Sequence, residues 1–208
     1  MNQTNSRILA AVLRWRSVVR PVALGMGVGL ASLTGANIAR ASLVEALDLP
    51  ALVAEADRVL LVRVMAASSL YDANGQIVTD FAMQVEETLK GDEAPGAAIV
   101  VRKLGGEVDG VGMRVSGEPN FQVGETVLLF GSALDGSTTL RPLGMAQGAV
   151  RVFEKDGKRW ARSSAGGVSA VRRTAGGQLK SAPLAVPEAR KLDDLLGEIR
   201  SLVVTKRR

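Results

Sequence analysis

The run Val59-Leu60-Leu61-Val62-Arg63-Val64-Met65 decides the fold, because every position in it except Arg63 is apolar. A continuous apolar run rich in β-branched valine indicates a buried strand. A few residues later, Asn74-Gly75 gives a strong signal for a tight hairpin turn. Residues 77–86 then alternate apolar and polar side chains, which predicts one face in the core and one face in water. This part of the chain is therefore predicted to form a β-hairpin.

Short strands and turns continue on the C-terminal side of this hairpin. We predict strands over residues 98–104, 113–115, 126–130, 138–143, 149–153 and 159–162. The last two flank Asp156-Gly157, which is a second clear hairpin signal. Several short strands at regular spacing, joined by turns, favour a small β-barrel or sandwich. A short helix is predicted to open at Asp48, ahead of the strands, because Pro50 suits the first turn of a helix.

A second helix is predicted over residues 187–205, because apolar side chains recur there at helical spacing. We expect this amphipathic C-terminal helix to dock on the barrel through its apolar stripe. Residues 163–186 lack clear periodicity and are rich in small residues, so they are predicted to be a loop or linker. A short strand over 168–172 is the alternative there. The barrel domain, with a hairpin extension, is then 42–162, and the fold class is mainly β with one helix on each side.

Residues 1–41 are predicted to be a secretory signal peptide. They hold five arginines and no acidic residue, and the apolar run 22–33 is followed by small residues at Ala39 and Ala41. Cleavage is expected near Ala41 by the Sec route, because no adjacent arginine pair precedes the run. The protein would then be periplasmic or extracellular. An uncleaved anchor in the inner membrane is the alternative, since residues 22–38 are just long enough to span a bilayer.

Removal of this leader changes the charge balance of the chain. The full sequence has 26 basic and 21 acidic residues, and five of the basic residues precede Ser42. The mature chain would be neutral, so we do not expect nucleic acid as a partner. The sequence contains no cysteine and no histidine. Disulfides, thiolate nucleophiles, imidazole bases and ordinary zinc sites are therefore excluded, and we expect no cofactor and no catalytic residue.

Three stretches of the sequence carry a resemblance to known proteins. They are residues 56–64 (ADRVLLVRV), 85–91 (VEETLKG) and 121–130 (FQVGETVLLF). In them the chain resembles a family of secreted bacterial proteins with an OB-like barrel, related in outline to the netrin and tissue-inhibitor-of-metalloproteinase module. The resemblance implies a small OB-like barrel over about residues 50–131. It implies no activity, because those inhibitors chelate their target's zinc through an N-terminal cysteine and this chain has no cysteine.

Three carboxylates around a glycine-rich segment form the first candidate binding site. Glu107 and Asp109 lie within residues 105–112, and Glu118 follows shortly after. Glycine allows oxygen ligands to approach a cation, so a calcium site is conceivable, but the spacing fits no EF-hand pattern. A solvated turn is the favoured interpretation, and we predict no metal site. The same groups could also supply the acid and base of a glycosidase.

Basic and aromatic residues form the second candidate binding site. Arg151, Arg159 and Trp160 lie on the predicted hairpin over 149–162, a pattern that resembles a stacking surface for single strands or glycans. Aromatic residues make up only 3% of the chain, which is few for a stacking surface. Ordinary packing of the hairpin is the simpler interpretation.

These observations lead to one main hypothesis and two alternatives. The main hypothesis is an exported, non-catalytic domain that binds a protein or a component of the cell envelope. It would meet the membrane only through an uncleaved N-terminus. The alternatives are a secreted hydrolase that uses carboxylates and a signal-anchored inner-membrane protein. Two carboxylates facing each other across a cleft would favour the enzyme, whereas a surface without such a pair would favour the binding domain.

Overall fold

The computed structural model describes residues 42–134, 136–164 and 168–206, and the prediction of a leader over residues 1–41 lies outside them. The described elements are mainly strands, with a short helix near the beginning and a longer helix at the C-terminal end. The mainly β class with two flanking helices is therefore confirmed. No helix in this part of the chain is long and apolar enough to cross a membrane.

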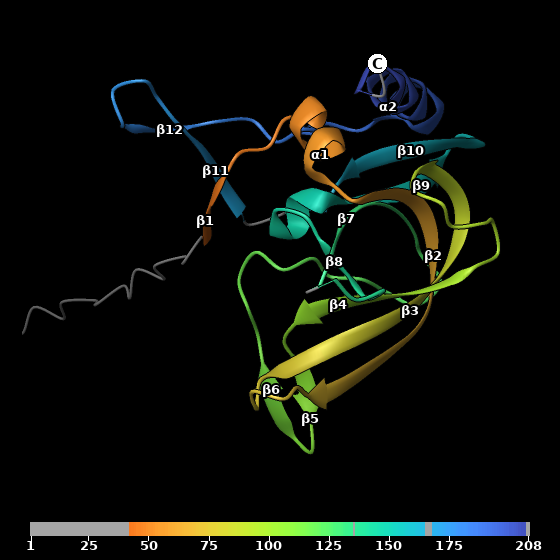
Figure 1. Ribbon diagram of the computed structural model, residues 1–208, viewed down its shortest axis with the longest axis vertical. Coiled ribbons are helices and arrows are strands. Elements are labelled where there is room, and N and C mark those ends of the chain that lie inside the picture. The colour runs from red at the N-terminus through yellow and green to blue at the C-terminus, as the bar shows by residue number, and fades with distance from the viewer. Residues whose placement is uncertain (1–41, 135, 165–167, 207–208) are drawn as a thin grey trace, which may run out of the picture. The chain divides into compact units, whose positions relative to one another are not determined.

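Five strands form a closed ring, which Figure 1 shows from one end. They are β2 (Arg58–Tyr71), β3 (Ile77–Lys90), β4 (Ala98–Leu104), β7 (Thr126–Ala133) and β8 (Leu140–Pro142). Neighbours follow the order β2-β3-β4-β8-β7, and β7 pairs with β2 to complete the ring. Every pairing is antiparallel except that of β4 with β8, where Val101 lies opposite Leu140 in a parallel contact. The barrel therefore closes through one three-residue strand.

The β2–β3 hairpin is longer than predicted and curves around the barrel. The side chain of Asp72 accepts hydrogen bonds from the N–H groups of Asn74 and Gln76, which closes the predicted turn. The register of the two strands shifts at three places between Val59 and Ala66 of β2. Such irregularities bend and twist a strand, so they allow one hairpin to wrap a small barrel. The predicted inward face of residues 77–86 is confirmed, since Phe81, Met83 and Val85 are buried.

Residues 59–62 of β2 and residues 127–131 of β7 are buried on both faces and divide the core in two. Their inward side chains, such as Leu60 and Leu129, fill the barrel. Their outward side chains, such as Leu61 and Phe130, pack against the helices. This double burial explains why the two segments are continuous apolar runs without strict alternation.

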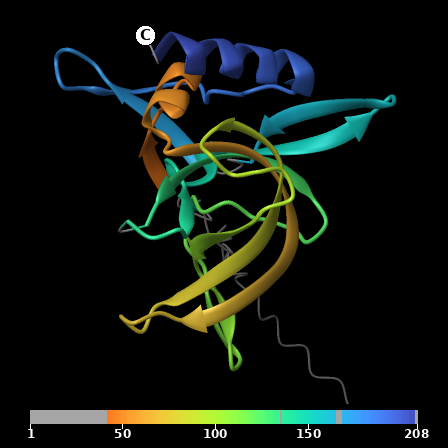
Figure 2. The same cartoon turned by 45° about the vertical axis from the view of Figure 1, so that its right-hand side comes forward.

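The two helices lie together on one side of the barrel, as Figure 2 shows. They are α1 (Leu49–Glu55) and α2 (Leu192–Lys206). The apolar stripe of α2 is buried against the outside of the barrel, as predicted, with Leu192, Leu195 and Ile199 inaccessible to solvent. The helix begins five residues later than predicted, because Arg190–Lys191 forms the short strand β13, which pairs with β10 (Lys158–Ser163).

A protruding hairpin extends the sheet beyond the ring. It consists of β9 (Ala149–Lys155) and β10 (Lys158–Ser163), and β9 pairs with β7. Asp156 and Gly157 both adopt positive φ at its tip, as the predicted turn requires.

Residues 163–186 are not an unstructured linker throughout the described part. They contain β11 (Val168–Arg173) and β12 (Leu179–Ser181), so the alternative of a short strand over 168–172 is confirmed. β11 also pairs in parallel with β1 (Ser42–Glu45). Together with β12, these two strands form a separate three-stranded sheet. Gln147 in the 3-10 helix η1 (Met145–Gly148) secures the chain after β1, since its amide donates to the carbonyl of Glu45 and accepts from the N–H of Leu47.

The glycine-dense segment after β4 is a small hairpin of β5 (Gly106–Val108) and β6 (Val111–Met113). Asp109 and Gly110 form its tip and both have positive φ. This hairpin corrects the prediction of a turn followed by a strand over 113–115. It rests on the far end of the β2–β3 hairpin (Figure 1).

Candidate functional site

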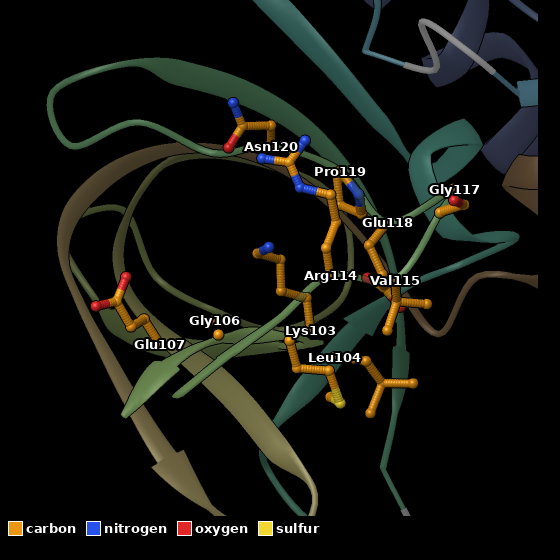
Figure 3. A pocket seen from close by; sticks show the side chains of 13 residues that line it. Lys103, Leu104, Gly106, Glu107, Arg114, Val115, Gly117, Glu118, Pro119 and Asn120 are labelled. Atoms are coloured by element: carbon orange, nitrogen blue, oxygen red, sulfur yellow. The ribbon is translucent and has the colours of Figure 1, made fainter. Parts of the chain in front are cut away.

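Two adjoining hollows at the mouth of the barrel, on the side of β5 and β6, share three residues. These are Lys103, Leu104 and Glu118. The larger hollow has a volume of about 740 Å³ and lies between the end of β4, the β5–β6 hairpin and the segment 114–120. The smaller one lies between the β2–β3 turn, β4 and β8. We refer to the two hollows together as the barrel mouth, and Figure 3 shows the side chains that line the larger one.

The alternation of β4 places Lys103 at this mouth. Ile99 and Val101 of the same strand contribute to the apolar interior of the barrel, and Lys103 is the next residue on that face. The strand ends one residue later at Leu104. The side chain of Lys103 therefore extends from the edge of the apolar interior into the hollow. Figure 3 shows this side chain within the ring opening.

The glycines after β4 hold the wall of the hollow in place. Thr79 donates a hydrogen bond from its hydroxyl to the carbonyl of Gly105 at 2.6 Å, and the hydroxyl of Ser69 lies 3.0 Å from that of Thr79. A β-carbon on Gly106 would overlap both hydroxyl oxygens, and Gly106 also has a φ of 146°. Only glycine therefore fits where the β5–β6 hairpin meets the β2–β3 hairpin.

Partial burial lowers the pKa of Lys103 and raises the pKa of Glu118, so it favours the neutral form of each. Desolvation lowers the pKa of Lys103, and the positive charge of Arg114 lowers it further, whereas the carboxylate of Glu118 opposes this shift. Desolvation also raises the pKa of Glu118, against the effects of Lys103, a backbone hydrogen bond from Leu104 and the charge of Arg141. Both ionised forms are therefore held in a site that solvates them poorly.

The cations around Glu118 lack close partners. Among the described residues, Lys103, Arg114 and Arg141 form no ion pair within 4 Å and no side-chain hydrogen bond. Arg102, which lines the smaller hollow, is different, because Nε and Nη2 of its guanidinium donate to the two carboxylate oxygens of Asp80 at 2.6 and 2.7 Å. The mouth thus combines one fully paired arginine with three cations that are available to a ligand.

The structure brings together two of the three predicted carboxylates. Glu107 and Glu118 both line the larger hollow, but Asp109 is at the exposed tip of the β5–β6 hairpin and does not line it. In Figure 3, Glu107 and Glu118 lie on opposite sides of the Lys103 side chain. No group of three or more metal-binding side chains occurs in the described ranges. The three carboxylates therefore do not form one cluster.

The second predicted group is divided between the two faces of the β9–β10 hairpin. Trp160 lies opposite Phe153 in the register, so they share a face. Arg151 is also on that face, and its Nε lies 2.8 Å from a carboxylate oxygen of Glu125. Arg159 alternates to the other face, where a nitrogen of its guanidinium lies 3.9 Å from Asp193 of α2. These three residues therefore do not form one stacking surface.

Sequence reasoning did not select Lys103, Arg114 and Arg141. One available signal was the alternation in residues 98–104, which places Lys103 on the inward face with isoleucine and valine. A charged residue at an inward position near a strand end indicates a barrel mouth. The other two arginines have no local signal, because they come from a loop and from a strand far apart in the sequence.

Comparisons with known proteins add no family to this description. No protein-family model matches the sequence, and no curated protein matches it.

Proposed function

We propose that this protein is an exported, non-catalytic binding domain whose ligand occupies the barrel mouth at Lys103 and Glu118. The observation that supports this most is that two opposite charges are partly buried there without forming an ion pair with each other. Charged side chains are normally left in water or are paired when they are buried. A polar ligand would compensate the lost hydration, so the arrangement suits binding better than it suits stability.

We also propose that the barrel is OB-like, as the sequence resemblance implies. The ring order β2-β3-β4-β8-β7, with one parallel contact, supports this proposal. OB barrels bind ligands on the face of their second and third strands and on the loops after the first and fourth strands. The equivalent loops here, residues 72–76 and 137–139, both contribute to the hollow that includes Lys103.

Export is the part of the proposal that concerns location. It rests on the arginine-rich, acid-free leader and on the small residues at Ala39 and Ala41. The test is the intact mass of the protein recovered from a producing cell. A mass that begins near Ser42, in a periplasmic or culture fraction, would support the proposal. A mass that begins at Met1 in the membrane fraction would support the signal-anchored alternative instead.

The binding role can be tested by recovering envelope components that purify with the protein. The test variant combines Lys103→Met with Glu118→Gln, which removes both charges and keeps the net charge of the protein. The control variant combines Lys155→Met with Glu188→Gln, two exposed positions outside the mouth. A component that is retained by the wild type and the control but lost from the test variant supports the proposal. If no component depends on the mouth, the binding site is elsewhere or absent.

A carboxylate-dependent hydrolase is the second candidate, and one observation favours it. Glu118 has a raised pKa and shares a hollow with Glu107, and a general acid needs a carboxyl group that stays protonated. Hydrolysis of purified envelope glycan that disappears in Glu118→Gln and in Glu107→Gln would establish this role. Lys103→Met should then also alter the pH profile, because its charge lowers the pKa of Glu118.

A further inference from the structure

We propose that the barrel mouth takes an anionic oxygen group, a carboxylate or a phosphate, between Lys103 and Arg114. This inference rests on the proposed function and names the chemistry of its ligand. The first reason is the set of charges that face the site. Lys103 comes from β4, Arg114 follows β6 and Arg141 comes from β8, whereas Arg102 of β4 is paired with Asp80. The acidic groups are Glu118, the exposed Glu107 and Asp72, whose side chain accepts hydrogen bonds from N–H groups of its own turn.

The second reason is that the positive charge of Arg114 lowers the pKa of Lys103, an effect that the charge of Glu118 opposes from beyond 4 Å. Neither Lys103 nor Arg114 has an acidic partner within 4 Å in the described residues. Like charges held together cost free energy unless an anion lies between them. In the view of Figure 3, the Lys103 side chain lies in the ring opening and the Arg114 side chain lies along its edge. An incoming anion would therefore meet two cations at once.

The third reason is the chemistry of the two donors. The guanidinium group presents parallel N–H groups that match the oxygens of a carboxylate or a phosphate, and an ammonium group adds a compact point charge. Partial removal from water strengthens such hydrogen bonds compared with those at a fully exposed site. A neutral sugar hydroxyl would use less of this arrangement than an anionic group would.

Glu118 makes the binding dependent on pH. A bound anion would repel an ionised Glu118, whereas the protonated carboxyl group of Glu118 could donate a hydrogen bond to the anion. The charges of Lys103 and Arg141 act on Glu118, and Arg114 lines the same hollow. Glu107 and Asp72 are the other carboxylates of the barrel mouth. Binding of an anion should therefore be accompanied by proton uptake and should become tighter as the pH falls below neutrality.

The test is an NMR titration of the protein in the form that is recovered from the producing cell. Inorganic phosphate and acetate serve as the two probes, since they separate the two sources of the anionic group. We expect saturable shifts in the side-chain signals of Lys103 and Arg114 with at least one probe. Lys103→Met should weaken the binding about tenfold, as expected for loss of one charge-assisted hydrogen bond. Lys155→Met removes the same charge at an exposed position outside the mouth and should leave the affinity unchanged.

Glu118→Gln provides an independent readout of the same site. This variant should bind the probe at pH 8 more tightly than the wild type does, and its affinity should change less between pH 5 and pH 8. Absence of saturable shifts with both probes would overturn the inference, as would shifts that persist unchanged in Lys103→Met. If an envelope component still depends on the mouth while both probes fail, the proposed binding function stands and only the anionic chemistry is wrong.

Discussion

The helix-covered side of the barrel and the barrel mouth differ in the ion pairing of their charged residues. On this side, Arg58, the first residue of β2 after α1, contacts the carboxylates of Asp92 and Glu93, and the exposed Arg200 of α2 contacts that of Glu87. At the mouth, Lys103 and Arg114 have no such partner in the described part of the chain. The first arrangement is complete within the molecule, whereas the ligand that we propose would complete the second. This difference distinguishes charged residues that stabilise the fold from charged residues that are available to the proposed ligand.

Two of the stretches that carry the sequence resemblance contribute polar contacts to the first region. Lys90, in the segment VEETLKG, donates hydrogen bonds to the carbonyls of Val53, Ala54 and Ala56 at the end of α1. Asp57 accepts a hydrogen bond from the N–H of Ala133 on β7. These residues fasten the first helix and the barrel together, which explains why the motifs indicate a fold and carry no information on a ligand.

The largest effect is expected from the shared apolar wall on the helix side. Phe130→Ala removes a side chain that is inaccessible to solvent between β7 and the helices. The free energy of unfolding should fall by about 3–5 kcal/mol, as for large-to-small changes in a core. Chemical denaturation monitored by circular dichroism would measure it. Leu104→Ala at the mouth, where the side chain is 37% exposed, should cost far less. Equal losses would mean that the mouth is packed as tightly as the core.

Lys90→Met should have the next largest effect, because Lys90 caps the C-terminal end of α1. Three backbone carbonyls would lose a charged donor, and an ammonium near a helix C-terminus also interacts favourably with the helix dipole. We expect a loss of about 1–3 kcal/mol in the same denaturation measurement. Lys155→Met, at an exposed position of β9, is the matched control and should change the stability little. A loss below that of the control would show that the capping contacts contribute nothing.

The sequence predicts the helix-covered side of the barrel better than it predicts the barrel mouth. Hydrophobic patterning places β2, β3, β7 and the apolar face of α2, because these features depend on burial that is visible in a short window. The patterning fails for residues 190–191, which join a sheet through a strand far away in the sequence. The mouth was predicted only in part, through Glu107 and Glu118. Arg114 and Arg141 reach it by tertiary contacts, and no local pattern encodes those contacts.

Gly106→Ala should destabilise the junction between the two regions. The new β-carbon would overlap the hydroxyls of Ser69 and Thr79, and the residue would keep an unfavourable positive φ. We expect a loss of about 1–3 kcal/mol, and weaker binding at the mouth because the β5–β6 hairpin would shift. Gly112→Ala is the matched control in the same hairpin, since a β-carbon there meets nothing within 4 Å and φ is not positive. If both variants are equally stable, the close approach at Gly106 does not hold the hairpin.

The smallest effect is expected from the pH dependence of stability at the mouth. Because burial raises the pKa of Glu118 in the folded state above its ordinary value of 4.5, the folded protein holds this proton more firmly than the unfolded chain does. The stabilising contribution of Glu118 is therefore complete below pH 4.5 and is lost as the pH rises through its folded-state pKa.

Glu118→Gln mimics the protonated form, so the variant should gain stability relative to the wild type at pH 7 and lose that advantage at pH 4. Denaturation of both proteins at the two pH values measures this difference. Glu188→Gln removes an exposed carboxylate far along the chain and should show no such change between pH 4 and pH 7. A Glu118→Gln variant that is less stable than the wild type at pH 7 would mean that Glu118 is held by its cations after all. The barrel mouth would then resemble the helix-covered side, with its charges satisfied within the molecule and no vacancy for an anion.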